Sequence, residues 1–85
     1  MNGQSTLIAR GLVVRVSFEG TRAGSASLMI YLEAGMAFEV YVDTLGERYF
    51  KLFNTACSAM WDRKNVEVIY QIRGGDGFAL DIRAL

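Results

Sequence analysis

The chain has 85 residues, with no histidine, no proline and a single cysteine, Cys57. Without histidine, neither a Ser–His–Asp nor a Cys–His catalytic arrangement can form. One cysteine and no histidine cannot supply the common zinc ligand sets. A single cysteine also has no partner within the chain with which to form a disulfide. We therefore predict a non-enzymatic protein with no catalytic residues, no metal site and no cofactor. Because small secreted domains often depend on disulfides, we expect a cytoplasmic location.

The chain also lacks an excess of either charge. Nine basic residues balance nine acidic ones, and the pI is about 6.2. A general nucleic-acid binder usually carries a basic patch and a high pI, so this balance counts against non-specific binding. No segment is apolar over the ~18 residues of a membrane span, and the first residues do not resemble a signal peptide. We thus expect no membrane partner.

Apolar residues make up 52% of the sequence, and many of them recur at every second position. Such alternation predicts strands with one buried face. The expected inward positions are Leu12, Val14, Val16 and Phe18; Ala26, Leu28, Ile30 and Leu32; Phe38, Val40 and Val42; Val66, Val68, Tyr70 and Ile72; Phe78, Leu80 and Ile82. Short turns are expected at residues 34–35 and 74–77 because both segments contain glycine. This pattern therefore predicts five strands whose apolar faces pack into one common core.

The period changes between the third and fourth predicted strands. Thr44 and Glu47 have the spacing of a capping box. Apolar residues then recur at steps of three and four over about residues 45–63, which predicts an amphipathic helix ending near Asn65. Trp61 lies one position beyond the apolar stripe; we predict a lid on the core, with an interface anchor as the alternative. Cys57 is expected to be a small buried or half-buried residue near the core rather than a reactive thiol.

This order of three strands, a helix and two strands resembles the OB-fold over residues 11–85. The helix before the fourth strand is also similar to that of the B-subunits of AB5 toxins, although the chain lacks their cysteine pair. The resemblance implies a mainly β fold, a five-stranded barrel forming one OB-like domain over residues 1–85. The alternative is an α+β open antiparallel sheet with one helix packed on it.

Several side chains of the first three strands are expected to point away from the interior. OB-folds bind ligands across this region, where aromatic rings can stack on bases or sugars and an arginine can hold a phosphate or carboxylate. The candidate ligand-binding or interface residues are Arg15, Met29, Tyr31, Glu39 and Tyr41. The apolar side chains of Val13 and Met29 beside the tyrosines favour a subunit contact over a ligand site.

The sequence therefore predicts a binding or assembly module that forms a homo-oligomer. Its ligand is expected to be a protein, a glycan or a single-stranded nucleic acid. The alternative is a dedicated single-stranded nucleic-acid-binding OB-fold protein that uses Tyr31, Tyr41 and Arg15. An enzyme that uses carboxylates or tyrosines is the weakest interpretation, because a barrel this small rarely has the deep pocket that converging carboxylates require. Glu33, Glu39 and Asp43 are expected to be solvated.

Overall fold

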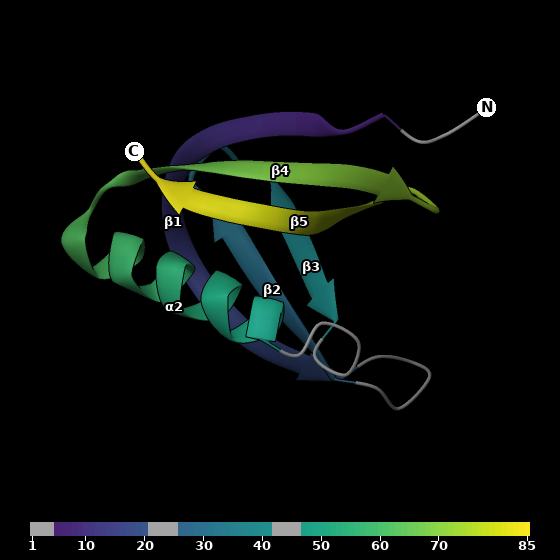
Figure 1. Cartoon of the computed structure of the whole chain (residues 1–85), viewed down its shortest axis with the longest axis horizontal. Coiled ribbons are helices and arrows are strands. Elements are labelled where there is room, and N and C mark those ends of the chain that lie inside the picture. The colour runs from purple at the N-terminus through teal and green to yellow at the C-terminus, as the bar shows by residue number, and fades with distance from the viewer. Residues whose placement is uncertain (1–4, 21–25, 42–46) are drawn as a thin grey trace.

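The computed structural model describes residues 5–20, 26–41 and 47–85 (Figure 1). The described elements are five strands and one helix: β1 Leu7–Gly20, β2 Ala26–Leu32, β3 Ala37–Tyr41, α2 Glu47–Asp62, β4 Asn65–Arg73 and β5 Asp76–Ala84. The prediction of a mainly β chain with five strands and one helix is confirmed. Several predictions fall outside the described residues: the inward Val42, the solvated Asp43, Thr44 of the capping box and the apolar Leu45. The side chain of Ala26, also expected inside, is not among those described.

The five strands form one mixed sheet. Neighbouring strands follow the order β1-β2-β3-β5-β4, and β4 pairs back with β1. All pairings are antiparallel except that of β3 with β5, which is parallel and consists of the single pair Glu39–Phe78. The strands are thus unevenly joined, with extensive ladders on both sides of β1 and a narrow junction between β3 and β5.

Strand β1 is long because it pairs with two other strands along different parts of its length. Its first half pairs with β4 and its second half with β2, and the strand curves strongly between them (Figure 1). At the change of partner, Val13 lies opposite Leu32 but Arg15 lies opposite Tyr31, so Val14 is an extra residue in a β-bulge. A bulge bends its strand and changes which residues face inward.

The bulge corrects the predicted inner face of β1. Val13, expected to point outward, is buried in the core, and Val14, expected inside, is 54% exposed. Leu12 is only half-buried. Beyond the bulge Val16 packs against the core as predicted, whereas Phe18 is 56% exposed. The alternation is correct after the bulge and reversed before it, because one additional residue shifts the side-chain parity.

The β4–β5 hairpin turns at Gly74 and Gly75, whose φ angles are 58° and 87°. Two consecutive positive φ angles are typical of a two-residue type I′ turn, which glycine adopts without strain. The turn places Arg73 opposite Asp76, which continues the ladder up to the loop. The predicted hairpin turn is confirmed, and it is shorter than the four residues proposed from the sequence.

A second bulge lies in β5. Tyr70 is opposite Ala79 and Ile69 is opposite Asp81, so Leu80 is the extra residue. Ala79 is therefore buried in the core, while Leu80, expected at the centre of the inner face, is only half-buried. The prediction for this strand is wrong at Leu80 because the bulge changes the parity within β5.

The core is formed by the inward-facing side chains of the strands together with one face of α2. The largest side chains with no more than 2% exposure come from four strands and the helix: Phe38, Leu28, Ile30, Leu32, Leu52, Ile82, Val40, Val66 and Val68. From the helix, Leu52, Ala56 and Ala59 face this core. The helix packs mainly against β1 and β5, beside the strands in Figure 1.

The C-terminal end of α2 is closed by a Schellman motif. The Lys64 amide donates to the Ala59 carbonyl at 2.9 Å, and the Arg63 amide donates to the Met60 carbonyl at 3.3 Å. Arg63 has a φ of 56°, the left-handed conformation that glycine usually supplies at this position. The helix therefore ends at Asp62, with Arg63 rather than Asn65 reversing the chain.

We expect Arg63→Gly to raise the free energy of unfolding by about 0.5–1 kcal/mol, because glycine removes the cost of a left-handed L-residue. Urea denaturation at low micromolar concentration would measure this gain. Gly74→Ala is the matched reverse change, since Gly74 has a φ of 58° and open space around it. It should lose a similar amount. A loss of stability in Arg63→Gly would contradict the interpretation.

Candidate functional site

The outer face of the sheet carries a row of paired residues that crosses all five strands. From β1 through β2, β3 and β5 to β4, the row is Ser17, Met29, Glu39, Phe78 and Gln71. Paired residues in neighbouring strands project their side chains to the same side of a sheet. The row therefore forms one continuous surface across the narrow β3–β5 junction.

Four of the five predicted site residues lie on this surface. Met29 and Glu39 belong to the row, and Arg15 and Tyr31 form the adjacent cross-strand pair. The Cζ atom of Arg15 lies 5.3 Å from the centre of the Tyr31 ring, within the range of a cation–π contact. Tyr41 continues β3, but its side chain is not among those described. The structure thus brings Arg15, Met29, Tyr31 and Glu39 together.

A second arginine–aromatic pair, which the sequence did not predict, lies on the same surface. Phe78 was expected inside, but it pairs with Gln71 and Glu39 on the outer face. Its ring is only 8% exposed although it is not part of the core cluster. The Cζ atom of Arg73 lies 5.4 Å from the ring centre. We call this face, with Arg15, Met29, Tyr31, Glu39, Arg73 and Phe78, the outer-face site.

The hairpin contains the signal that could have revealed Phe78. A two-residue turn pairs odd-numbered residues of one strand with even-numbered residues of the other. Yet the apolar positions of both predicted strands are even-numbered. The two apolar faces can lie on the same side of the sheet only if one strand contains an extra residue that shifts its pairing. A bulge in β5 was therefore implied, with Phe78 opposite Gln71 on the outer face.

The chemistry of the outer-face site suits a ligand that is both flat and anionic. An arginine stacked on a ring still has donors at the edge of its guanidinium, which can bind a phosphate or carboxylate. Tyr31 and Met29 are half-buried and offer apolar contact surface between the two pairs. Glu39, also half-buried, can accept hydrogen bonds from amino or hydroxyl groups.

Nucleophilic and metal chemistry finds little support among the described residues. Within residues 5–20, 26–41 and 47–85, no three His, Cys, Asp or Glu side chains lie close enough to hold a metal ion. Cys57 is half-buried, and this burial raises the pKa of its thiol, which favours the less nucleophilic protonated form. In the described part of the chain, no helix is long and apolar enough to cross a membrane.

A buried carboxylate on the opposite part of the sheet was missed by sequence reasoning. Glu67 of β4 is 4% exposed and lies between its cross-strand neighbours Arg10 and Arg83. Arg10 donates from Nε to Oε2 at 2.9 Å, and Arg83 donates from Nε to Oε1 at 3.0 Å. The Nη2 atoms of both arginines lie 2.8 Å from the same oxygens. Each carboxylate oxygen is therefore held by one guanidinium.

These arginines keep Glu67 ionised. The hydrogen bond from Arg10 lowers the pKa of the Glu67 carboxyl below its ordinary value of 4.5; burial opposes this shift and the positive charge of Arg83 adds to it. When folding lowers the pKa of a group, that group stabilises the folded protein at pH values above the pKa it has in the unfolded chain. This stabilisation disappears as the pH falls through the pKa that the group has in the folded protein. The Glu67 contribution is therefore present at neutral pH and lost below about pH 4.5.

We expect Glu67→Gln to be less stable than the wild type at pH 7, because the two arginines lose their anionic partner. The difference between the two proteins should shrink as the pH falls below about 4.5, where the wild-type carboxylate is protonated too. Urea denaturation between pH 3 and pH 7 would measure it. A difference that stays constant over this range would show that the charge of Glu67 does not stabilise the fold.

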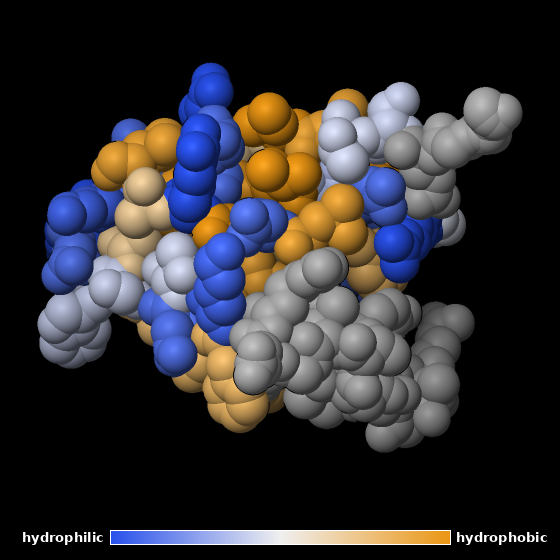
Figure 2. All heavy atoms as spheres, viewed as in Figure 1, coloured by the Kyte–Doolittle hydropathy of each residue, from blue (hydrophilic) through white to orange (hydrophobic). Residues whose placement is uncertain are grey.

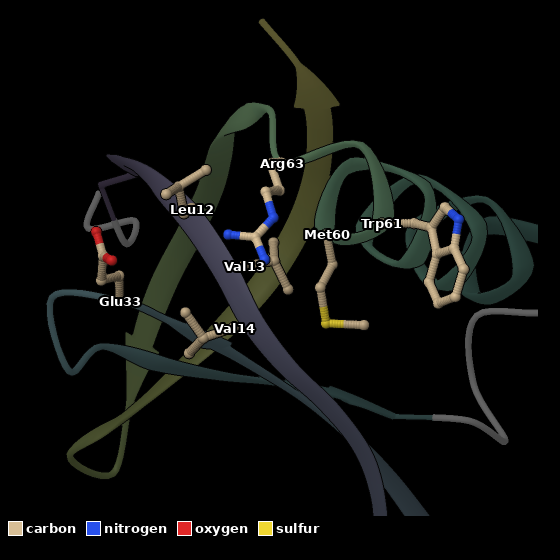
Figure 3. A pocket seen from close by; sticks show the side chains of 7 residues that line it. All are labelled: Leu12, Val13, Val14, Glu33, Met60, Trp61 and Arg63. Carbon is tan, nitrogen blue, oxygen red and sulfur yellow. The ribbon is translucent and has the colours of Figure 1, made fainter.

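A second surface is an open groove of about 460 Å³ between β1 and the C-terminal end of α2 (Figure 3). The residues lining it are Leu12, Val13, Val14, Glu33, Met60, Trp61 and Arg63. The bulge turns Val14 out into this groove. In Figure 3, Glu33 lies on one side of β1, and Arg63, Met60 and Trp61 lie on the other. We call this surface the bulge groove.

Trp61 does not cover the core. It is 86% exposed, the highest value among the large exposed hydrophobic residues of the described chain. Since successive helical residues are rotated by about 100°, Trp61 points away from the face formed by Ala56 and Ala59. The prediction of a core lid is wrong. Hydrophobic residues also reach the surface over β4, β5 and α2, where Figure 2 shows them between bands of hydrophilic side chains.

The chain thus presents an outer-face site with two arginine–aromatic pairs and an apolar bulge groove with Trp61 at its rim. Both surfaces exist because a bulge turned an apolar residue, Val14 or Phe78, toward the outside. Comparison of the chain with protein-family models, curated proteins and solved structures finds no match.

Proposed function

We propose that the chain is a non-enzymatic, OB-like binding and assembly module. In this proposal the five strands act as a small barrel that holds a ligand on its outer face and associates with copies of itself. The strand order β1-β2-β3-β5-β4 and the position of α2 between β3 and β4 support the OB-like assignment. The lack of histidine supports a binding role over acid–base catalysis.

The observation that carries the proposal is the pairing of Arg15 with Tyr31 and of Arg73 with Phe78 on one face. The two pairs flank Met29 and Glu39, so apolar contact surface and both signs of charge are available together. The outer face of β2 and β3 is the surface on which OB-folds bind oligonucleotides and oligosaccharides. A ligand that crosses from β2 to β5 would contact both pairs.

Single-stranded nucleic acid is the second, more specific candidate function. Bases stack on aromatic rings and phosphates pair with arginine. The outer-face site offers two exposed arginines, Arg15 and Arg73, and one accessible ring, that of Tyr31, because Phe78 is buried. The chain as a whole has no net charge, so its attraction for phosphate must come from these local arginines. Binding would therefore be moderate and would weaken as salt concentration rises.

Fluorescence anisotropy with a labelled 15-nucleotide oligothymidine at low salt would test the nucleic-acid candidate. Because a stacked base is worth about 1–3 kcal/mol, Tyr31→Ala should weaken binding by roughly 5- to 150-fold. Phe50→Ala is the matched control, since Phe50 is an exposed aromatic residue of α2 outside the site. No change in anisotropy at any protein concentration up to the millimolar range would end this candidate.

The wider proposal is tested by NMR titration of the labelled protein with oligonucleotides, oligosaccharides and acidic peptides. The expected result is that at least one of them shifts the amide signals of Tyr31 and Glu39 on the central strands and of Phe78 on β5. A ligand that shifts signals elsewhere, or no shift with any class of probe, would contradict the outer-face site.

A further inference from the structure

We propose that the bulge groove is the interface for a second copy of this chain, joined across a two-fold axis. This inference rests on the self-association in the proposed function and gives it a location. It commits to a symmetric dimer in which each copy places its Trp61 against the groove of the other. The residues that carry it are Val14, Glu33, Trp61 and Arg63.

The groove combines two charged side chains with apolar ones that a folded chain gains nothing from exposing to water. Trp61 is 86% exposed at the rim and Val14 is 54% exposed between the two sides. Tryptophan is the residue type most enriched among the positions that dominate binding energy at protein interfaces. An exposed tryptophan beside a concave apolar surface supplies both a projecting side chain and a receiving surface on the same molecule.

The charges of the groove favour a copy of the chain over an unrelated occupant. Glu33 lies on one side of β1 and Arg63 on the other (Figure 3). Both are exposed, and among the described residues neither forms an ion pair. A two-fold axis through the bulge at Val14 would place Glu33 of each copy against Arg63 of the other. An interface of this isologous kind requires such a self-complementary surface.

The groove is also held in a fixed shape before any partner binds. The Schellman motif fixes the backbone of Arg63, and the hydrogen bond from the Glu33 amide to the Leu12 carbonyl, 2.9 Å long, fixes the other side. Because neither backbone segment has to become ordered on association, the conformational entropy that is lost is that of the interface side chains. The backbones of the two charged residues therefore keep their separation across β1 when two copies meet.

Sedimentation equilibrium from 5 to 500 µM, with the full chain, tests the inference. We expect a monomer–dimer equilibrium for the wild type. Trp61→Ala should raise the dimer dissociation constant about thirtyfold or more, the effect of removing a dominant interface residue. Phe50→Ala is the matched control, since Phe50 is also an exposed aromatic residue of α2 but does not line the groove. It should leave the constant unchanged.

Charge reversal separates this geometry from a dimer formed elsewhere. Glu33→Arg and Arg63→Glu should each weaken the dimer, because like charges then meet twice across the axis. The double variant should restore the wild-type constant. Circular dichroism would confirm that each variant is folded.

The outcomes distinguish the inference from the proposal on which it rests. A wild-type monomer at every concentration would overturn both the proposed self-association and this interface. A dimer that Trp61→Ala leaves intact would overturn only the interface and would place the self-association on another face. A dimer weakened by Trp61→Ala but not restored by the double charge reversal would contradict the two-fold pairing of Glu33 with Arg63.

Discussion

Phe38→Ala is expected to lower the free energy of unfolding by about 3–5 kcal/mol. Phe38 of β3 is 1% exposed, and its ring centre lies 4.7 Å from that of Tyr70 on β4. Removing the ring would leave a cavity between strands that are not neighbours in the sheet, where the backbone cannot easily collapse. Since domains have total stabilities of about 5–15 kcal/mol, the variant would lose much of its stability.

Phe18→Ala supplies the matched control on β1. Phe18 is 56% exposed, and its ring contacts that of Phe53 of α2, with ring centres 5.6 Å apart. Its replacement should cost no more than about 1.5 kcal/mol, the upper range for an aromatic pair. Urea denaturation followed by circular dichroism would compare the two variants. Equal losses, or a larger loss for Phe18→Ala, would show that the core is not centred on β3 and β4.

Gly77→Ala is expected to lower the free energy of unfolding by about 1–3 kcal/mol, because the new methyl group overpacks the core. A Cβ at Gly77 would lie 3.1 Å from Cδ1 and 3.4 Å from Cε1 of Phe38, and 3.5 Å from the Ala37 carbonyl oxygen. The Phe38 ring is 1% exposed and packs against the ring of Tyr70, so it would have to shift within the packed core to accept the methyl group. Glycine is therefore required here for a close approach of β5 to β3.

Gly11→Ala is the matched substitution in β1. A Cβ at Gly11 would lie 3.7 Å from Cδ1 and 3.8 Å from Cβ of Leu32, which is ordinary van der Waals contact. The φ of Gly11 is not positive. We therefore expect Gly11→Ala to be neutral or to raise the free energy of unfolding by about 0.4–1 kcal/mol. Equal effects of the two substitutions would contradict the close approach at Gly77.

The sequence predicted the buried centres of β2, β3 and β4 correctly, whereas Ile72 near the end of β4, also expected inside, is 47% exposed. Leu28 and Ile30, Phe38 and Val40, and Val66 and Val68 are all buried as expected. Met29 in β2 and Ile69 in β4 interrupt the alternation, but the other residues of the odd-numbered face are mostly polar or amphipathic, which favours turning the even-numbered face to the core. The same parity placed Met29, Tyr31 and Glu39 on the outer face.

Strands β1 and β5 could not be predicted as well, for one shared reason. Each bulge lies in a run of three consecutive apolar residues, 12–14 and 78–80. In such a run either parity places an apolar side chain inside, so hydrophobicity does not choose between them. What decides is strand pairing: β1 must match β4 with one parity and β2 with the other, and the tight glycine turn imposes a similar change on β5.

These ambiguous runs are also where the candidate surfaces arise. Phe78 completes the second arginine–aromatic pair, and Val14 forms part of the bulge groove. The groove was not predicted, because it joins β1, the β2–β3 turn and the end of α2, which are far apart in the sequence. Trp61 was assigned to the core because it lies next to the apolar stripe of the helix, and the sequence defines the edge of such a stripe only approximately.

The central claim is that two bulges set the faces of the sheet, and cross-strand backbone NOEs in the labelled protein test it most directly. The structure predicts NOEs that pair Val13 with Leu32 and Arg15 with Tyr31 on the two sides of the first bulge, and Tyr70 with Ala79 and Ile69 with Asp81 on the two sides of the second. Unbroken ladders that continue from the Arg15–Tyr31 and Ile69–Asp81 pairs would instead pair Val14 with Leu32 and Tyr70 with Leu80. Observing these alternative pairs would return Val14 to the interior and remove the structural basis of both proposed surfaces.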